Sequence, residues 1–516
     1  MIGAVVAQVG GPVAPIDTPR VVWHALTPLL VLLGGAVVLV VVASLRPRRP
    51  RIGWHAIVTI LVALGAIGAV VPLWRDVHRN GPFSVMADAV GVDGFSLFLT
   101  VVICASVVIA ALLLDGYLRR ESLEGPEAYV LLLLSASGGV IMAGANDLIV
   151  MFLGLEVLSI SVYVLAGLHL RRLRSGEAAL KYFLLGAFSS AFFLYGIALV
   201  YGATGSTNLV RIADFFARNT LSDERLLLAG IALLLVGFGF KVAAVPFHTW
   251  TPDVYQGSPS PVVAYMATGV KAAGFAGLIR VFVLALGPYR LDWQPVVYWL
   301  AILTMVVGAV LAVVQTDVKR MLAYSSINHA GFILVGVQAA TRRGVSSALF
   351  YLAAYLFMVG GSFGIVTLLG RRGDGRHRLA DYEGMGRRHP VLSMLFAVFL
   401  LAQAGTPLTG GFLAKFYVVQ AAVEARSFWL ALAAMVTAVI SAFLYLRIIL
   451  AMYAGGDADE EASTSEAAPP GRLRVPPMAR LALAIALIGT VGIGLVPGPL
   501  TRTARDATPA LVSGGR

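Results

Sequence analysis

Residues 233–250 read LLLVGFGFKVAAVPFHTW and residues 400–416 read LLAQAGTPLTGGFLAKF, two apolar segments that each contain one lysine and one proline. Proline inside a helix removes a hydrogen bond and clashes with the preceding turn, so both segments are predicted to be broken helices. The residues expected to break them are Pro246 in the first segment and Pro407, Gly410 and Gly411 in the second. Backbone groups freed at membrane depth are tolerated only in a protein interior or beside water. Each break therefore predicts a hydrated cavity beside its lysine, Lys241 or Lys415.

The chain around these segments is too apolar for a soluble protein. Of its 516 residues, 59% are hydrophobic and only 13% are charged, whereas soluble domains carry about 25% charged residues. A transmembrane helix needs about 20 mostly apolar residues. The sequence offers fourteen such runs, centred near Gly35, Gly65, Cys104, Ser135, Ser159, Phe192, Leu234, Ala272, Met305, Leu334, Phe357, Leu401, Val439 and Leu487. We therefore predict an all-α polytopic membrane protein with about 14 transmembrane helices, of which helices 7 and 12 are broken.

Basic residues are distributed unevenly between alternate loops. The loops that follow odd-numbered spans carry 20 Lys and Arg residues, and the other loops and tails carry 13. The positive-inside rule places the more basic loops in the cytoplasm, so both termini are predicted outside. In so apolar a chain, the net charge of +12 indicates loop orientation and gives no reason to expect a nucleic-acid partner.

Three polar stretches are not expected to span the membrane. Residues 76–92 and 204–226 are predicted to be loops with short interfacial helices. Residues 456–479 open with GDADEEASTSEAAPP and are predicted to form a flexible cytoplasmic tether. The single cysteine, Cys104, excludes a disulfide framework or a cysteine-ligated iron–sulfur cluster within the chain. No glycine-rich phosphate loop follows a strand, so cofactors are expected in partner subunits and not in this chain.

Lysine is rare and is concentrated in the predicted spans. Only five of the 39 basic residues are lysines, and Lys319 alone among them lies in a predicted loop. A guanidinium keeps its proton above about pH 12, whereas a desolvated ammonium can release one. Charges within a membrane cost about 3 kcal/mol and persist mainly along ion or substrate paths. The lysines predicted to carry protons are Lys181, Lys241, Lys271 and Lys415.

Two further titratable residues join this prediction. Glu156, in DLIVMFLGLEVLSISVYVLAG (147–167), is the lone acid deep within a predicted span and the natural counter-ion for a lysine. His329, in SSINHAGF (325–332), is a candidate relay in the second half of the chain.

Each candidate also has a structural explanation. Lys241, Lys415 and Lys181 are near predicted helix ends or breaks, where a lysine can extend to the lipid headgroups. Glu156 in a packed, protonated state, or His329 as a hydrogen-bonded core residue, would need no functional role. Lys271 lies about eleven residues into its span, which is too deep to reach the headgroups easily.

The spacing of these residues predicts an internal repeat. Lys241 and Lys415 are 174 residues apart, and Glu156 and His329 are 173 apart. Spans 4–8 and 9–13 then form two five-helix repeats, which an odd number of helices makes inverted. The predicted division is residues 1–125 for spans 1–3, 126–285 and 286–455 for the two repeats, 456–479 for the tether, and 480–516 for the last span and C-terminal tail.

Five segments resemble subunit N of bacterial respiratory NADH-quinone oxidoreductase (complex I). They are GLEVLSISVYVLAGL (154–168), ALKYFLLGAFSSAFFLYG (179–196), KVAAVPFHTWTPDVYQGSPSPVVAYMATGVKAAG (241–274), LAYSSINHAGF (322–332) and TPLTGGFLAKF (406–416). The wording FHTWTPDVYQGSP is more similar to subunit N than to its paralogues or to cation/proton antiporter subunits, which typically read LHTWLPDA there.

The resemblance implies an antiporter-like, proton-translocating subunit in a multi-pass arrangement in the bacterial cytoplasmic (inner) membrane. Such a subunit is part of a translocase but performs no redox chemistry itself. NAD, FMN, iron–sulfur clusters and quinone would be bound by partner subunits, and the other membrane-arm subunits and the lipid bilayer would be its neighbours. The implied proton path runs along Glu156, Lys181, Lys241, Lys271, His329 and Lys415. Two alternatives are a stand-alone cation/proton antiporter and a non-transporting scaffold, although a scaffold gives no reason for buried lysines.

Overall fold

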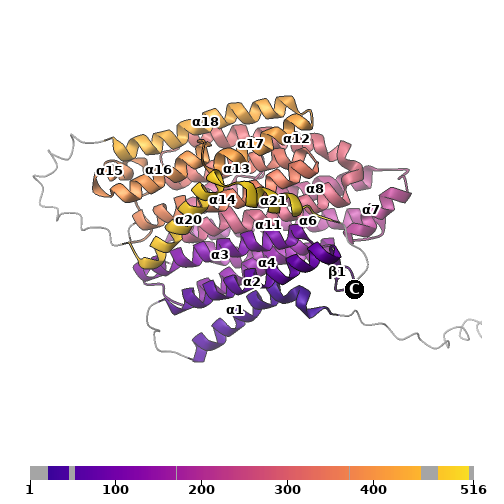
Figure 1. Cartoon of the computed structure of the whole chain (residues 1–516), viewed down its shortest axis with the longest axis horizontal. Helices are drawn as coiled ribbons and strands as arrows, with labels where there is room; N and C mark the ends of the chain where they lie inside the picture. The colour runs from indigo at the N-terminus through magenta and orange to yellow at the C-terminus, as the bar shows by residue number, and fades with distance from the viewer. Residues whose placement is uncertain (1–20, 46–52, 170, 371, 455–474, 511–516) are drawn as a thin grey trace, which may run out of the picture.

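The computed structural model describes residues 21–45, 53–169, 171–370, 372–454 and 475–510. The predicted tether lies almost entirely outside these residues. The described part is a bundle of long helices that run side by side (Figure 1). The long helices are α1 (Thr27–Leu45), α2 (Trp54–Asn80), α3 (Gly94–Glu121), α4 (Glu127–Gly144), α5 (Leu148–Ala166), α6 (Leu173–Thr204), α8 (Arg225–Val242), α12 (Arg290–Val313), α13 (Val318–Gln338), α14 (Arg342–Leu369), α16 (Pro390–Ala404), α17 (Gly410–Glu424), α18 (Phe428–Tyr453) and α20 (Pro477–Leu495).

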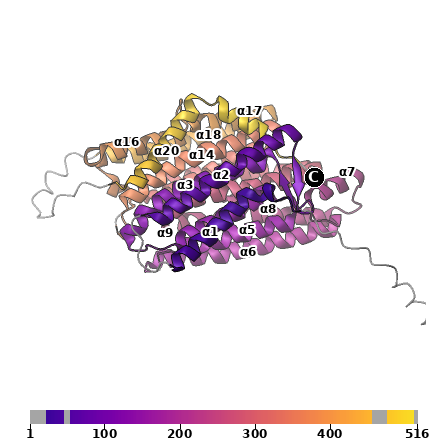
Figure 2. The ribbon, with the colours of Figure 1, turned by 60° about the horizontal axis from the view of Figure 1, so that its bottom comes forward.

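Short elements connect or interrupt these helices. They are η2 (Trp23–Leu26), β1 (Phe83–Val85), β2 (Val90–Val92), α7 (Leu209–Arg218), α9 (Trp250–Gly257), α10 (Ser260–Tyr265), η3 (Met266–Val270), α11 (Lys271–Leu278), η4 (Ile279–Ala285), η5 (Gly287–Tyr289), η6 (Leu379–Tyr382), α15 (Met385–Arg388) and α21 (Gly498–Asp506). In Figure 1, α1 and α2 form one edge of the bundle and α18 the other. Figure 2 shows α5 and α6 together on a further face.

Twelve helical segments among the described residues are long and apolar enough to cross a membrane. The predicted all-helical membrane protein is therefore confirmed. Helix α13 and the α16–α17 pair, which the sequence predicts as spans 10 and 12, are not among the twelve. Helix α13 contains several polar side chains, and the break divides α16–α17 into two 15-residue helices.

Helices α8 and α16 stop where the sequence predicts breaks. Helix α8 ends at Val242, Ala243 adopts a left-handed backbone with φ 63°, and α9 begins only at Trp250. Helix α16 ends at Ala404, Gly405 has φ 97°, and α17 starts at Gly410. The segment around Lys271 shows a third irregularity that the sequence did not predict, because the π-helical turns η3 and η4 flank α11. Such π turns are frequent at functional sites.

The two polar loops on the same side of the bundle differ from each other. In residues 76–92, α2 continues to Asn80 and an antiparallel hairpin pairs Phe83 with Val92, so the predicted interfacial helix is wrong there. In residues 204–226 the expected short helix is present as α7. Both ends of the described chain lie near this hairpin: Ala25 packs in one cluster with Val92, and the Ala510 amide donates to Asp93. We call this the hairpin end and the opposite one the Asp374 end.

Two matching pairs of backbone hydrogen bonds occur at opposite ends of the bundle. At the hairpin end the pairs are Leu148 N to Thr207 O (2.9 Å) and Leu209 N to Asn146 O (2.8 Å). At the Asp374 end they are Val318 N to His377 O (2.7 Å) and Leu379 N to Thr316 O (2.8 Å). Each residue of the second set is 170 positions after its counterpart. Helices α5 and α13 therefore start in the same local structure but at opposite ends, capped by Asp147 and Asp317.

Candidate functional site

Lys241 lies in the last turn of α8, beside the break, and only 4% of it is exposed. Its Nζ donates a hydrogen bond to Ser159 Oγ on α5 at 2.7 Å and lies 6.0 Å from the centre of the Tyr163 ring. A cavity of about 10 Å³ adjoins Lys241 and Ser159, which is the lower limit for one water molecule. The side chain is thus held away from lipid, and it does not extend to the headgroups.

Glu156 lies on α5, three residues before Ser159, and is half-buried. Its Oε1 has no hydrogen-bond partner among the described residues. The carboxylate is near enough to interact electrostatically with Lys241, but no ion pair within 4.0 Å joins them in the described part of the chain. The two groups are therefore near one another without being in contact.

Lys271 begins α11 and is buried, with 3% exposed. Its Nζ donates to both the carbonyl oxygen and the Oγ of Ser326 on α13, each at 2.6 Å, and lies 5.5 Å from the centre of the Tyr355 ring. One turn further along α11, a Cβ on Gly274 would be only 3.2 Å from Cγ of Lys241. Helix α11 thus packs on the stem of Lys241 and directs its own lysine toward the second half of the chain.

His329 is fully buried on α13, between two tyrosine hydroxyls. Its Nδ1 is 2.6 Å from the Tyr351 hydroxyl and its Nε2 is 3.0 Å from the Tyr445 hydroxyl. The Tyr445 hydroxyl is also 2.6 Å from Ser325 Oγ, next to the serine that accepts from Lys271. These groups form a chain of hydroxyl, imidazole and ammonium groups, each of which can exchange protons.

Lys415 lies in the second turn of α17 and is 7% exposed. Its Nζ donates to the carbonyl oxygen of Ala404, the last residue of α16, at 2.9 Å. A carbonyl freed by the helix break is therefore occupied by the lysine across the break. Gln403, the residue before Ala404, accepts a long 3.5 Å hydrogen bond from Ser325. The polar groups consequently extend from Lys271 to within one residue of the carbonyl that Lys415 contacts.

Lys181 is not brought into this buried line. Its side chain is 42% exposed on α6, where Nζ pairs with Glu177 at 2.7 Å and with Asp253 at 2.9 Å. Asp253, which lies on α9, also pairs with Arg320. Lys181 therefore belongs to a cluster of ion pairs that joins α6 to the broken-helix segment.

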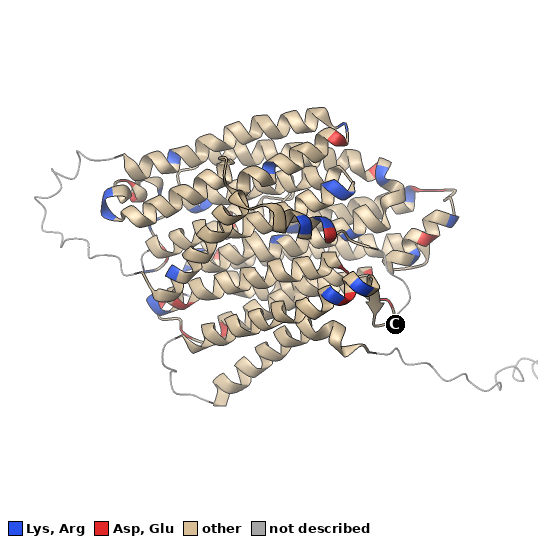
Figure 3. Cartoon of the chain, viewed as in Figure 1, with Lys and Arg blue, Asp and Glu red and all other residues tan. Residues whose placement is uncertain are grey.

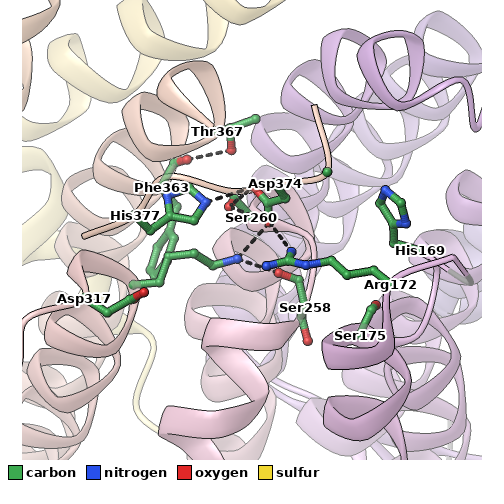
Figure 4. Close-up of polar contacts among 12 residues, drawn as sticks. His169, Arg172, Ser175, Ser258, Ser260, Asp317, Phe363, Thr367, Asp374 and His377 are labelled. Carbon is green, nitrogen blue, oxygen red and sulfur yellow. Dashed lines mark hydrogen bonds and ion pairs between the residues drawn. The ribbon is translucent and has the colours of Figure 1, made fainter. Parts of the chain in front are cut away.

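The sequence placed Lys319 in a loop, and this prediction is wrong. Lys319 lies in the first turn of α13, fully buried, and its Nζ pairs with Asp374 Oδ2 at 2.9 Å and donates to Ser258 O at 2.6 Å. Figure 4 shows Asp374 facing Ser260, Arg172 and His377, from three different segments of the chain. The distances to Asp374 are 3.2 Å from Ser260 Oγ, 3.4 Å from Arg172 Nη1 and 3.1 Å from His377 Nε2. Sequence analysis missed this cluster because Asp374 looks like an ordinary loop acid.

The charges of this cluster compensate one another. Burial alone would raise the pKa of the Asp374 carboxyl, but the Lys319 ammonium and the His377 ring hold that pKa well below its usual range. The carboxylate is thus ionised and fixes the loop between α14 and η6 onto α13. Figure 3 shows many other Lys and Arg residues at the same end of the bundle.

A second buried pair, also missed, closes the hairpin end. Arg280 on η4 is fully buried, with Nη2 2.7 Å from Asp93 Oδ1 and Nε donating to Ala143 O at 2.6 Å. Asp93 caps α3. The pair combines an always-charged guanidinium with a capping carboxylate, which fits a structural role.

Comparisons with known proteins agree with this geometry. Residues 145–441 match the family described as "NADH:quinone oxidoreductase/Mrp antiporter, TM". NADH-quinone oxidoreductase subunit N of Rhodococcus opacus is 44% identical, covering 94% of this chain and 95% of that protein. The same subunit of Mycobacterium bovis is 39% identical, covering 96% and 99%.

Solved structures give the same result. A chain of respiratory complex I from Thermus thermophilus with bound aureothin superposes with a TM-score of 0.75 at 34% identity, covering 95% of this chain and all of that one. A chain of the Mrp complex from Dietzia sp. reaches a TM-score of 0.82 at 22% identity, covering 94% and 97%, and shares the fold alone.

The fold and its buried lysines define an antiporter-like subunit of a proton-translocating membrane complex. The chain belongs to the family of NADH-quinone oxidoreductase subunit N, in the membrane arm of complex I. The resemblance predicted from the sequence is thereby confirmed.

Proposed function

We propose that protons cross this subunit along the buried line from Lys241 through Lys271 and His329 to Lys415. The observation that carries the proposal is the hydrogen-bonded chain from Lys271 through Ser326 and the adjacent Ser325 to Tyr445 and His329. Lysines can release protons in such surroundings, whereas arginines cannot. Glu156 adjusts the charge of Lys241, and Lys181 links α6 to the broken helix next to it.

The proposal includes a direction. The Asp374 end faces the cytoplasm and both termini face outside, because the loops at the Asp374 end are the more basic ones. Protons are taken up on the cytoplasmic side and released from Lys415 to the outside. Neighbouring membrane-arm subunits supply the driving force by moving charge near Glu156, and the surrounding lipid bilayer insulates the path. NAD, FMN, iron–sulfur clusters and quinone are bound by other subunits.

We further propose fourteen crossing segments arranged as two inverted repeats, with the residue ranges given above. Helix α13 and the interrupted pair α16–α17 complete the fourteen. The backbone hydrogen bonds repeated after 170 residues at opposite ends support the inversion. They also change the register: counted from the caps Asp147 and Asp317, Ser159 corresponds to His329, whereas the lysine spacing aligned Glu156 with it.

The lysines beside the two breaks are not equivalent by position relative to the proline. Lys241 comes five residues before Pro246, and Lys415 comes eight residues after Pro407. A rotation of about 180° that superposes the two repeats should therefore bring Asp147 close to Asp317. If the hydrogen bonds at the caps do not coincide after that rotation, the repeat proposal fails.

The alternative function is that of a stand-alone cation/proton antiporter. The test is purification of the chain, with an affinity tag, from native membranes. We expect redox subunits to copurify and the preparation, in sealed vesicles, to take up protons when NADH is oxidised. A chain that purifies alone and exchanges sodium for protons would contradict the proposal and favour the alternative.

A further inference from the structure

A cavity of about 720 Å³ opens at the Asp374 end, outside the buried lysine line. It lies where α3, α14, η6, α15 and α20 meet. Its lining residues are Leu113, Gly116, Tyr117, Arg120, Thr367, Leu368, Leu369, Gly370, Arg372, Arg376, Asp381, Tyr382, Met385, Arg388, His389, Pro476 and Ala479.

Three buried polar groups in this lining have no hydrogen-bond partner among the described residues. They are the hydroxyls of Tyr117 and Tyr382, each on a side chain 1% exposed, and Nη2 of Arg120. Arg120 is held in place by its other nitrogens, which bond to Glu121 at 2.8 Å and to Thr367 O at 2.6 Å. Its Nη2 is 3.9 Å from Asp374 Oδ1, too far for a hydrogen bond. Buried donors without acceptors are costly, so three in one cavity point to a ligand that supplies acceptor oxygens.

The rim of the cavity is positively charged. Arg372, Arg376 and Arg388 join Arg120 there, against one acid, Asp381. The Asp381 carboxylate already accepts from the backbone amide of Arg378. A ligand bound in this cavity is therefore expected to carry negative charge.

The opposite part of the cavity is apolar. Leu113, Gly116, Tyr117 and Arg120 form one stripe of α3, so Leu113 lies about 10 Å from Arg120 along the helix. Leu368, Met385 and Ala479 face the same space from three other elements. A cavity of this volume suits an organic ligand and exceeds the needs of an inorganic ion.

We propose that this cavity binds an anionic phospholipid, whose phosphate accepts hydrogen bonds from Tyr117, Tyr382 and Arg120 while an acyl chain lies along α3 and α20. Inorganic phosphate offers the same acceptor oxygens but leaves the apolar part of the cavity unused. Anionic headgroups concentrate at basic pockets on the cytoplasmic face of membranes. The site lies beside the Asp374 cluster, so the lipid would stabilise the loop that this cluster fixes.

The test is native mass spectrometry of the full-length chain in detergent micelles doped with phosphatidylglycerol or with phosphatidylcholine of the same acyl chains. We expect phosphatidylglycerol to be retained in preference to phosphatidylcholine, and excess inorganic phosphate not to displace it. Tyr117→Phe combined with Tyr382→Phe should weaken retention by about tenfold or more, because it removes only the two unpartnered hydroxyls. Tyr182→Phe is the matched control, since that buried hydroxyl also lacks a partner among the described residues but lies outside the cavity.

Should the double variant misfold, Arg376→Gln at the exposed rim gives an independent test, with Arg218→Gln on α7 as its control. Arg376→Gln should lower the preference for phosphatidylglycerol, and Arg218→Gln should leave it unchanged. Equal retention of both lipids, displacement by inorganic phosphate, or undiminished retention in the folded Tyr117 and Tyr382 variant would each overturn the proposal.

Discussion

The Nζ of Lys241 donates a hydrogen bond to Ser159 Oγ at 2.7 Å, three residues along α5 from Glu156. The lysine is thus fixed to a neutral partner, and its potential counter-ion stays out of contact. A carboxylate that moves relative to a buried ammonium changes how tightly the ammonium holds its proton. This relationship lets a charge displacement near α5 act on Lys241.

Glu156 should act through its charge. Glu156→Gln preserves the volume and removes the negative charge, so proton uptake should fall at least about twofold, and Glu156→Asp should retain part of it. NADH-driven uptake in vesicles measures this. Full uptake in the Gln variant would show that Glu156 is protonated or only structural.

Tyr445 should be needed as a link because its hydroxyl joins Ser325 to His329. Tyr445→Phe removes that link while keeping the ring, and we expect proton uptake to fall about tenfold. Tyr182→Phe, which removes a hydroxyl without a partner among the described residues, serves as the control. Equal uptake in the two variants would place the proton path elsewhere.

Gly411 should be essential to the second break. A Cβ at this position would lie 1.8 Å from the carbonyl oxygen of Ala402, whereas a Cβ on Gly410 would meet only side chains, at 3.2 Å or more. Gly411→Ala should therefore lower the free energy of unfolding by about 1–3 kcal/mol, and Gly410→Ala much less. Thermal unfolding of the purified complex compares them, and similar transition temperatures would contradict the close approach seen at Ala402.

Asp374 should stabilise the protein at all physiological pH values. Asp374→Asn leaves the buried Lys319 without its counter-ion, a change that costs about 3–5 kcal/mol. Because the pKa of Asp374 is lowered in the folded protein, its contribution is complete above the unfolded value near 4 and is lost only as the pH falls further.

The difference in thermal stability between the native protein and Asp374→Asn should therefore remain constant from about pH 5 to pH 8. The control is Asp223→Asn, an acid whose side chain is 68% exposed. A difference that disappears within this range, or that is no larger than the control, would mean that the carboxylate is not held ionised by Lys319.

The sequence could predict what depends on local pattern. Apolar runs identify the helices, and proline with glycine identifies both breaks, because these residues act on their own backbone. The partners of buried charges were not predictable. Asp374 lies 55 residues from Lys319, and Asp93 lies 187 residues from Arg280. Only the folded chain brings these groups together, so Lys319 read as a loop residue and Arg280 was overlooked.

The register of the repeat shows the same limit. Matching Lys241 with Lys415 aligned two residues of the same type, whereas the backbone hydrogen bonds that start α5 and α13 repeat after 170 residues. Residue identity and backbone position are separate properties, and a three-residue difference exchanges Glu156 for Ser159 as the counterpart of His329.

The central claim is that Lys241 carries a proton and does not merely provide a fixed charge. NADH-driven proton uptake by vesicles containing the Lys241→Arg complex tests this most directly, with Lys241→Met as the neutral comparison. We predict that both variants assemble and that both lose most of their coupled proton uptake, because the guanidinium keeps its proton. Near-native uptake in the Lys241→Arg complex would contradict the claim and leave Lys241 with a fixed-charge role.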